Sequence, residues 1–413
     1  MSALESEKNA FVRSRRSSLI AAIFLMATSA IGPGFITQTT AFTATMGAAF
    51  AFGILASIII DFVVQQNIWR VVTLTQMRAS DVANAALPGS GYLLAVLVIF
   101  GGLVFNVGNI AGAGLGLNAM FGISPKLGGL ISAAIAIYIF TSRRAGVAID
   151  RLMVVLGIMM IVMMIGVMFV TKPPVGEALF QTVLPDHINF ATITTIVGGT
   201  VGGYICYAGA HRLLDKGMVG PEHIDAVSSA ANKGILVVGL MRYVLFLAIL
   251  GVVASGVTLD LSGQAANPAS QAFQYALGDF GVRIFGFIFW AAALTSVIGA
   301  AYTSVTFMSV FKTAMTDRQR NIATVLFIAV SLVIYLLLGT APAALLVFAG
   351  GFNGLVLPVG LSIFVYVGWK RADLMKGYRY PRWLLWTGLV TCLLTWYMGA
   401  LSVGTIFSFL EIV

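Results

Sequence analysis

Apolar residues are gathered along the chain into eleven long runs that are separated by short polar stretches. A helix needs about 20 predominantly apolar residues to span a bilayer. The pattern therefore predicts an all-α membrane protein with eleven transmembrane helices. The predicted segments are residues 18–46, 48–72, 90–121, 125–141, 145–171, 190–216, 226–255, 281–312, 320–339, 341–369 and 383–410.

The first segment is interrupted in its middle by Gly32, Pro33 and Gly34. Proline lacks an amide hydrogen and glycine makes the backbone permissive, so a continuous helix is disfavoured here. Irregular backbone at membrane depth is tolerated where it is buried in protein or lines a water-filled cavity. We therefore predict a broken helix at a solute site. The alternative is a proline kink whose threonines bond back to their own helix. The polar residues that follow the break are Thr37, Gln38, Thr39, Thr40 and Thr43.

The sixth segment carries a second glycine cluster, because residues 197–204 read Val-Gly-Gly-Thr-Val-Gly-Gly-Tyr. Breaks five helices apart are typical of transporters built from inverted repeats, whose half-helices meet at the midplane. Close packing through small residues explains one such cluster well and two at corresponding positions poorly. We expect a cytoplasmic N-terminal segment at 1–17, two inverted five-helix repeats at 18–171 and 190–369, and an additional helix at 383–410.

Composition and charge agree with a membrane location. Charged residues make up 9% of the chain and hydrophobic residues 59%, whereas soluble domains carry about 25% charged residues. Under the eleven-helix count, Lys126, Lys172 and Arg283 lie outside and Arg242 lies within the membrane. The other 20 of the 24 basic residues then share one side with the N-terminus. Basic loops face the cytoplasm, so we expect the N-terminus inside and the C-terminus outside. The net charge of +9 is thereby explained without a nucleic-acid partner.

Two charges fall deep within predicted spans, Asp61 in the second and Arg242 in the seventh. Each lies nine residues, or roughly 13 Å of helix, from a basic residue at the cytoplasmic end. A lone charge at this depth is expensive, so we predict that the two form an ion pair, with each bonded elsewhere as the alternative. His211 is a further coupling or gating candidate, although its place beside Arg212 favours a solvated histidine.

Other polar residues fall within the third and tenth segments. Asn106 and Asn109 lie one helical turn apart, so both could face one cavity or join neighbouring helices. Gly350 and Asn353 belong to a third glycine cluster near the midplane of the tenth segment. No cluster of Cys and His and no phosphate-binding loop is visible in the sequence.

Three stretches of the chain are distinctive. The most specific is Gly116-Leu117-Asn118-Ala119-Met120-Phe121-Gly122-Ile123, and the others are Gly32-Pro33-Gly34-Phe35 and Leu357-Pro358. These stretches resemble the NRAMP family of proton-coupled divalent-metal transporters. The resemblance implies a LeuT-type fold with helices 1 and 6 broken.

The chain departs from that family where the metal would bind. The family's metal-binding motif of helix one falls on residues 38–41, so that Gln38 and Ala41 replace an aspartate and an asparagine. The methionine of helix six falls on Gly202 or Gly203, the glutamine of helix ten on about Gly350, and the acidic pair of helix three on two asparagines. Divalent cations need carboxylates, and softer metals need thiolate, thioether or imidazole. Segments one, three and ten contain no Asp or Glu, and the sixth has none before Asp215.

We therefore expect a secondary active transporter, working by symport and alternating access, for a small organic solute with a carboxylate, of amino-acid or lactam size. Among relatives of this kind, the chain resembles bacterial proteins that accompany 5-oxoproline-metabolising enzymes, so 5-oxoproline is the first compound to test. The resemblance also implies the bacterial inner membrane. We expect a monomer in the lipid bilayer that is not an enzyme and has no cofactor or bound metal, with coupling to H⁺ or Na⁺. The expected solute-binding residues are Thr37, Gln38, Thr39, Thr40, Ala41, Asn106, Asn109, Gly202, Gly203, Tyr204, Gly350 and Asn353, and the coupling or gating residues are Asp61, Arg242 and His211.

Three alternatives stay open at this point. A carrier of hydrated Mg²⁺ or Mn²⁺ would be stabilised by those ions. A non-transporting membrane sensor would show no solute flux. An intramembrane enzyme would need a nucleophile and base or an HExxH motif, neither of which is visible.

Overall fold

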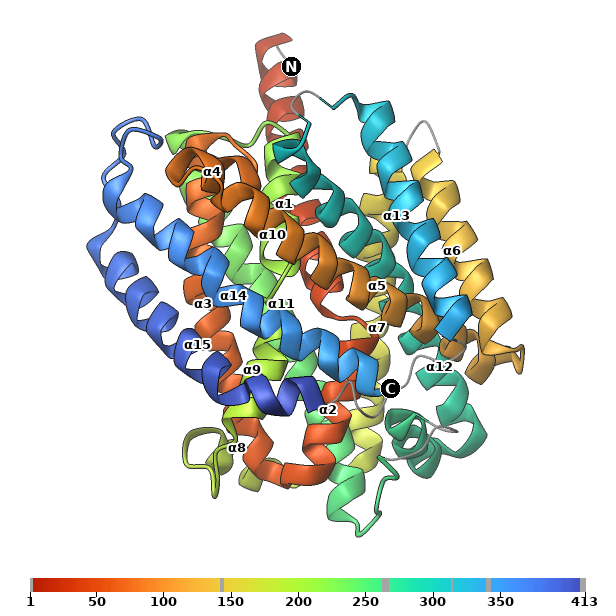
Figure 1. Cartoon of the computed structure of the whole chain (residues 1–413). Helices are drawn as coiled ribbons and strands as arrows, with labels where there is room; N and C mark the ends of the chain where they lie inside the picture. Colours follow the sequence, from red (N-terminus) through yellow and green to blue (C-terminus); the bar gives the residue numbers. More distant parts are fainter. Residues whose placement is uncertain (1–2, 142–144, 262–266, 313–314, 339–342, 409–413) are drawn as a thin grey trace.

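The computed structural model describes residues 3–141, 145–261, 267–312, 315–338 and 343–408. Within these ranges the chain forms helices and connecting turns, and no strand (Figure 1). The α-helices are α1 Ala3–Ala30, α2 Pro33–Met46, α3 Phe50–Thr75, α4 Ala79–Ala86, α5 Ser90–Phe121, α6 Pro125–Thr141, α7 Ala145–Thr171, α8 Val175–Val183, α9 Phe190–Gly198, α10 Ile205–Asp215, α11 Ile224–Ala254, α12 Pro268–Thr306, α13 Asp317–Leu338, α14 Ala343–Lys370 and α15 Arg382–Ser408. Three short 3₁₀ helices accompany them: η1 Gly47–Ala49, η2 Pro221–His223 and η3 Phe307–Val310.

Length and hydropathy qualify eight helical stretches of the described chain as membrane spans. Two shorter apolar helices, Arg16–Ala30 and Pro125–Thr141, come in addition. The prediction of an all-helical membrane protein is thus confirmed. The count of eleven spans and the division into two repeats stay predictions.

Burial separates the central helices from the peripheral ones. In the most apolar window of Pro268–Val310, which contains α12, 83% of the residues are buried, against 28% for α13. The centre is held together by close helix contact, since a Cβ on Gly116 of α5 would lie 2.7 Å from the carbonyl oxygen of Gly286 in α12. Small residues at such positions let backbones approach within a membrane. The lipid is therefore expected to contact α13 and to leave α12 in the interior.

Helix α12 begins earlier than the predicted segment at 281–312. Pro268 stands at its first turn, and the side chain of Asn267 accepts a hydrogen bond from the backbone N–H of Ala269. This cap starts a helix in a stretch too polar to be part of an apolar run. Gly278, with φ of +62°, then interrupts the helix before the apolar part begins.

Both predicted helix breaks are present. The first separates α1 from α2 at residues 31–32, and Pro33 occupies the first helical position of α2 after an extended Gly32. The second separates α9 from α10 at residues 199–204. No side-chain hydrogen bond caps the N-terminus of α2 or of α10. At the start of α10, the backbone N–H groups of Ile205 and Tyr207 donate instead to the carbonyl oxygens of Gly202 and Tyr204.

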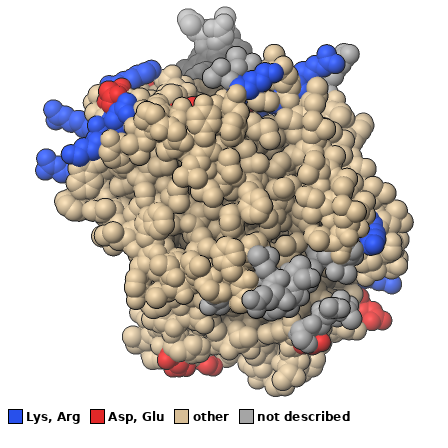
Figure 2. Space-filling view, viewed as in Figure 1, with Lys and Arg blue, Asp and Glu red and all other residues tan. Residues whose placement is uncertain are grey.

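Charged side chains divide between the two ends of the molecule. Most of the visible Lys and Arg lie at the end where the chain begins, and most of the visible Asp and Glu lie at the opposite end (Figure 2). This distribution agrees with the expectation that the basic end faces the cytoplasm. The orientation itself stays a prediction.

Candidate functional site: polar residues at the two helix breaks

Gln38 lies where both broken helices meet α14. Its side chain is fully buried, and Nε2 donates a hydrogen bond of 3.2 Å to the carbonyl oxygen of Leu346 in α14. A Cβ on Gly199, in the second break, would lie 2.4 Å from Gln38 Oε1, and a Cβ on Gly350 would lie 2.2 Å from Nε2. The amide therefore fits only because these two residues are glycines. Gln38 Oε1 has no hydrogen-bond partner.

Asn353 of α14 packs against Gly202 and Gly203, toward the other end of the second break. Its Nδ2 donates to the carbonyl oxygens of Ala349 at 2.8 Å and Gly101 at 3.4 Å. A Cβ on Gly203 would lie 1.7 Å from Asn353 Oδ1, and Gly203 has φ of +56°, a conformation that favours glycine. Gly202 likewise lies against the Asn353 backbone, because a Cβ on Gly202 would lie 2.7 Å from the carbonyl oxygen of Asn353. Asn353 Oδ1 has no hydrogen-bond partner either.

Tyr204 and Asn109 lie beside the first break. The Tyr204 hydroxyl donates to the carbonyl oxygen of Ser29 at 3.2 Å, and its ring packs edge-on against Phe105 with the centroids 6.0 Å apart. Asn109 Oδ1 lies 3.3 Å from the position of a Cβ on Gly32. The Nδ2 donor of Asn109 is buried and without a partner.

The two asparagines of α5 do not share one environment. Asn106 Nδ2 donates to Ser331 Oγ of α13 at 3.0 Å, whereas Asn109 faces the break between α1 and α2. Residues three apart on a helix are about 60° apart around its axis, which is enough for two different neighbours. Asn106 thus joins α5 to α13, the interhelical role that the sequence left open.

The threonines of α2 follow two different patterns. Thr39 and Thr40 donate to the carbonyl oxygens four residues earlier, at 2.7 and 2.9 Å, as the kink alternative predicts. Thr37 Oγ1 is buried and has no partner. Ala41 is half-buried and offers no polar side chain.

Residues that the sequence did not single out also contribute. Ser304 of α12 lies opposite Gly102, where a Cβ would be 2.1 Å from its hydroxyl, and this hydroxyl has no partner. Ser296 Oγ of the same helix donates to the Thr28 carbonyl oxygen at 3.0 Å. A serine in an apolar segment gives no signal of this role, because Ser is common within membrane helices.

The shared property of this region is a set of buried polar atoms without partners. Buried polar groups in native proteins are nearly always hydrogen-bonded, so such a cluster marks a place where a polar ligand can bind. Apart from two nitrogens of the Arg242 guanidinium, these atoms belong to amide and hydroxyl groups and carry no charge. The unpartnered atoms at the breaks, which we call the neutral polar cluster, are Thr37 Oγ1, Gln38 Oε1, Asn109 Nδ2, Ser304 Oγ and Asn353 Oδ1.

The family model described as "Natural resistance-associated macrophage protein-like" (Nramp) matches residues 23–408 of the chain. The chain belongs to the Nramp family. An uncharacterised membrane protein of Bacillus subtilis, YcsG, is 48% identical over 389 residues, which cover 94% of this chain and 95% of the relative. An uncharacterised membrane protein of Haemophilus influenzae is 47% identical over 402 residues, 97% of this chain and 99% of the relative.

Solved structures support the same fold. The manganese transporter of Eremococcus coleocola superposes with a TM-score of 0.73 at 14% identity, covering 96% of this chain and 93% of that one. MhsT in complex with L-phenylalanine superposes with a TM-score of 0.64 at 16% identity, covering 94% and 98%. At such identities the likeness establishes the LeuT-like fold alone. Family and fold together point to a membrane transporter rather than an enzyme.

The prediction that Asp61 and Arg242 form an ion pair is wrong. Both residues are described, and no salt bridge joins them. Asp61 Oδ1 instead accepts a hydrogen bond of 2.5 Å from Gln65, one turn along α3. Arg242 of α11 lies over the Phe35 ring, 4.1 Å from its centroid. Equal depth in the membrane did not make the side chains meet, because Asp61 is bonded within its own helix and Arg242 lies against Phe35 of α2.

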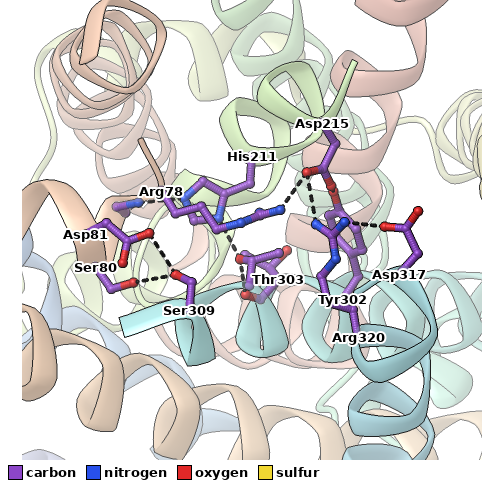
Figure 3. A network of polar contacts seen from close by, with 12 residues as sticks. Arg78, Ser80, Asp81, His211, Asp215, Tyr302, Thr303, Ser309, Asp317 and Arg320 are labelled. Atoms are coloured by element: carbon purple, nitrogen blue, oxygen red, sulfur yellow. Dashed lines mark hydrogen bonds and ion pairs between the residues drawn. The ribbon is translucent and has the colours of Figure 1, made fainter. Parts of the chain in front are cut away.

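His211 is also placed differently from the sequence expectation of a solvated residue. It is fully buried, and its ring lies beside those of Tyr207 and Phe307. The backbone N–H of Ala79 donates to His211 Nε2 at 3.0 Å, and Nδ1 lies 2.6 Å from Thr306 Oγ1 (Figure 3). An acceptor at Nε2 requires the neutral ring with its proton on Nδ1, which then donates to Thr306.

Asp215, at the end of α10, joins two other helices and the residue that precedes α4 near this histidine. It forms ion pairs with Arg78 at 2.6 Å and with Arg320 of α13 at 3.4 Å, and it accepts a hydrogen bond from Tyr302 of α12 (Figure 3). We call these four residues the Asp215 network. A cavity of about 360 Å³ lies beside it and is lined by Arg78, Arg320, Asp81, Thr306 and Ser309 among others.

Asp81, in the short helix α4, closes one side of that cavity. Its Oδ2 accepts a hydrogen bond of 2.9 Å from Ser309. Burial raises the pKa of this carboxyl above its ordinary value, and the Ser309 hydrogen bond partly opposes the rise. The Asp215 network connects Arg78, just before α4, with α10, α12 and α13. The hydrogen bond between Asp81 and Ser309 connects α4 itself with η3.

Proposed function

We propose that the protein is a secondary active transporter for a small organic solute that bears a carboxylate, of amino-acid or lactam size. The neutral polar cluster at the two helix breaks is the observation that carries the proposal. Amide and hydroxyl groups can hold the polar groups of an organic molecule, and the N-terminal ends of half-helices favour its carboxylate. We further propose symport with H⁺ or Na⁺ by a monomer in the bacterial inner membrane, with the N-terminus in the cytoplasm.

The donor atoms at the breaks fit a divalent cation poorly. Mg²⁺ and Mn²⁺ are held mainly by carboxylates, while softer metals prefer thiolate, thioether or imidazole. The unpartnered side chains that gather here are Gln38, Asn109, Asn353, a serine and a threonine. Within the described residues no group of three or more His, Cys, Asp or Glu side chains could hold a metal ion. A site for the polar groups of an organic solute explains why amide and hydroxyl side chains gather at the breaks.

Transport of a divalent metal ion is the second candidate. It is favoured by membership of the Nramp family and by the likeness to a manganese transporter. In this case the ion would keep part of its water shell and be held by amide and carbonyl oxygens. Selective stabilisation of the purified protein by Mn²⁺ or Mg²⁺, and not by organic acids, would favour this function.

The Gln38→Ala variant tests the place of the site. Removing the amide deletes the buried Oε1 acceptor and the Nε2 donor at the meeting point of α2, the second break and α14. We expect the affinity for the solute to fall by about tenfold, the loss for one good hydrogen bond. The measurement is thermal stabilisation of the purified protein by 5-oxoproline and other small acids.

Thr45→Ala is the matched control for this experiment. Thr45 lies on the same helix, is exposed, and donates only to carbonyl oxygens of its own helix. It should leave solute binding unchanged. Unchanged affinity in Gln38→Ala would place Gln38 outside the site.

A further inference from the structure

Arg242 of α11 carries a pair of hydrogen-bond donors that nothing in the described chain uses. Its side chain is 1% exposed, and both Nε and Nη2 are buried without partners. The remaining nitrogen, Nη1, lies 3.5 Å from the carbonyl oxygen of Ile196, at the outer limit of a hydrogen bond. Nε–H and the adjacent Nη2–H point the same way and form the edge of a guanidinium that receives a carboxylate through two parallel bonds.

The position of this donor pair connects it with the helix breaks. The guanidinium lies over the ring of Phe35, in the first turn of α2, and next to Ile196, near the end of α9. Phe35 precedes Gln38 by three residues, and Ile196 precedes Gly199 by three, where Gly199 and Gln38 touch each other. Residues three apart are neighbours on a helix surface. Arg242 therefore contacts both broken helices within one turn of the neutral polar cluster.

The nearest charge of opposite sign leaves the donor pair free. Asp61 attracts Arg242 electrostatically, but its carboxylate is held by Gln65 at 2.5 Å and forms no ion pair with the guanidinium. Burying a cation whose N–H groups are unpaired is strongly unfavourable, and removal of water from it is repaid only by an anion in direct contact. The arrangement is complete when a second carboxylate, supplied from outside the chain, occupies the free edge.

We propose that Arg242 anchors the carboxylate of the transported solute through Nε and Nη2. The inference rests on the proposed function and adds to it the residue that recognises the acid group. The neutral polar cluster then binds the uncharged polar groups of the solute. Asp61 supplies the negative charge that balances Arg242 when the site is empty.

The assignment makes a specific prediction about ligand chemistry. A guanidinium edge forms two charge-assisted bonds with a carboxylate and loses the charge attraction with the corresponding carboxamide. Native protein should bind a small acid such as 5-oxoproline at least about tenfold more tightly than its carboxamide. This comparison needs no variant, so it holds even if a substitution at the buried Arg242 prevents folding.

The test is the affinity of purified protein for a panel of small carboxylic acids and their carboxamides, measured by thermal shift and titration calorimetry. Arg242→Gln should weaken acid binding by about 30- to 100-fold, as expected for loss of two bonds to a charged group. The affinity of Arg242→Lys for the acid should lie between those of the native protein and Arg242→Gln, because an ammonium keeps the charge but cannot offer two parallel N–H groups. Lys233→Gln, an exposed cation on the same helix, is the matched control and should bind as the native protein does.

Other outcomes would contradict either the role of Arg242 alone or the proposed function as well. Equal binding of acid and carboxamide by native protein, or native-like acid binding by Arg242→Gln, would overturn the role of Arg242 and leave the proposed function standing. Recovery of acid binding when Asp61→Asn is added to Arg242→Gln would also overturn it, since Arg242 would then serve only to neutralise Asp61. Failure of every acid in the panel to bind the native protein would overturn the proposed function together with this inference.

Discussion

Replacing Gly198 with alanine should prevent α9 from packing on α14 and abolish transport. A Cβ at this position would lie 1.8 Å from the carbonyl oxygen of Gly350 and 2.3 Å from the amide nitrogen of Gly354. Both neighbours are backbone atoms of α14, so no side-chain rotation relieves the clash. We expect the free energy of unfolding to fall by about 3 kcal/mol or more, at the upper end of the range for overpacked interiors. The measurement is the melting temperature and folded yield of the detergent-purified protein.

Gly166→Ala provides the control for this prediction. Gly166 lies in α7, and a Cβ there would meet nothing within 4 Å. The alanine should be neutral or stabilising by up to about 1 kcal/mol because it favours the helix. If Gly198→Ala were as stable as Gly166→Ala, the close approach of the second break to α14 would be wrong.

Removing Asp215 should open the end of the molecule at which the chain begins. Two guanidiniums, of Arg78 and Arg320, and the hydroxyl of Tyr302 converge on this carboxylate. The Arg78 and Asp215 side chains are only 12% and 22% exposed, so Arg78 would be left partly buried without its anion, whereas Arg320 would keep its ion pair with Asp317. We expect Asp215→Ala to destabilise the closed arrangement by about 2 kcal/mol, below the value for a fully buried pair.

The opening can be measured as the rate at which a thiol reagent labels a cysteine introduced as Ser309→Cys, which lines the adjacent cavity. The natural cysteines, Cys206 and Cys392, are buried, so their labelling should be slow. Asp317→Ala is the matched control, because Asp317 is 90% exposed and pairs only with Arg320. Equal labelling rates in the Asp215 and Asp317 variants would show that Asp215 does not hold this end closed.

The sequence predicted the architecture because its strongest signals are local. Pro33 removes a helix hydrogen bond wherever it falls, and the glycines of residues 198–203 weaken a helix regardless of context. Hydropathy alone identified the membrane-spanning character of the chain. The paired breaks also implied a common midplane, which is why Gln38, Gly202, Gly203 and Gly350 were expected in one site.

The contacts of individual side chains could not be predicted in the same way. Arg242 was expected to reach Asp61 from its depth in the membrane, but depth does not give the direction in which a side chain points. His211 was expected in solvent because it lies beside Arg212, whereas its ring is buried and accepts a hydrogen bond from the backbone N–H of Ala79, the first residue of α4. Asn106 bonds to Ser331, a residue 225 positions away. These outcomes depend on how helices rotate against one another, which no local pattern specifies.

Uptake by proteoliposomes tests the central claim most directly, namely that the site at the helix breaks has no metal-binding carboxylates and carries an organic acid. Vesicles containing the purified protein would be given radiolabelled 5-oxoproline and other small acids, and separately radiolabelled Mn²⁺, under an imposed gradient of H⁺ or Na⁺. The account predicts accumulation of an organic carboxylate that Gln38→Ala diminishes, and no accumulation of Mn²⁺ above that of empty vesicles. Accumulation of Mn²⁺ that depends on Gln38, with no uptake of any acid, would contradict it.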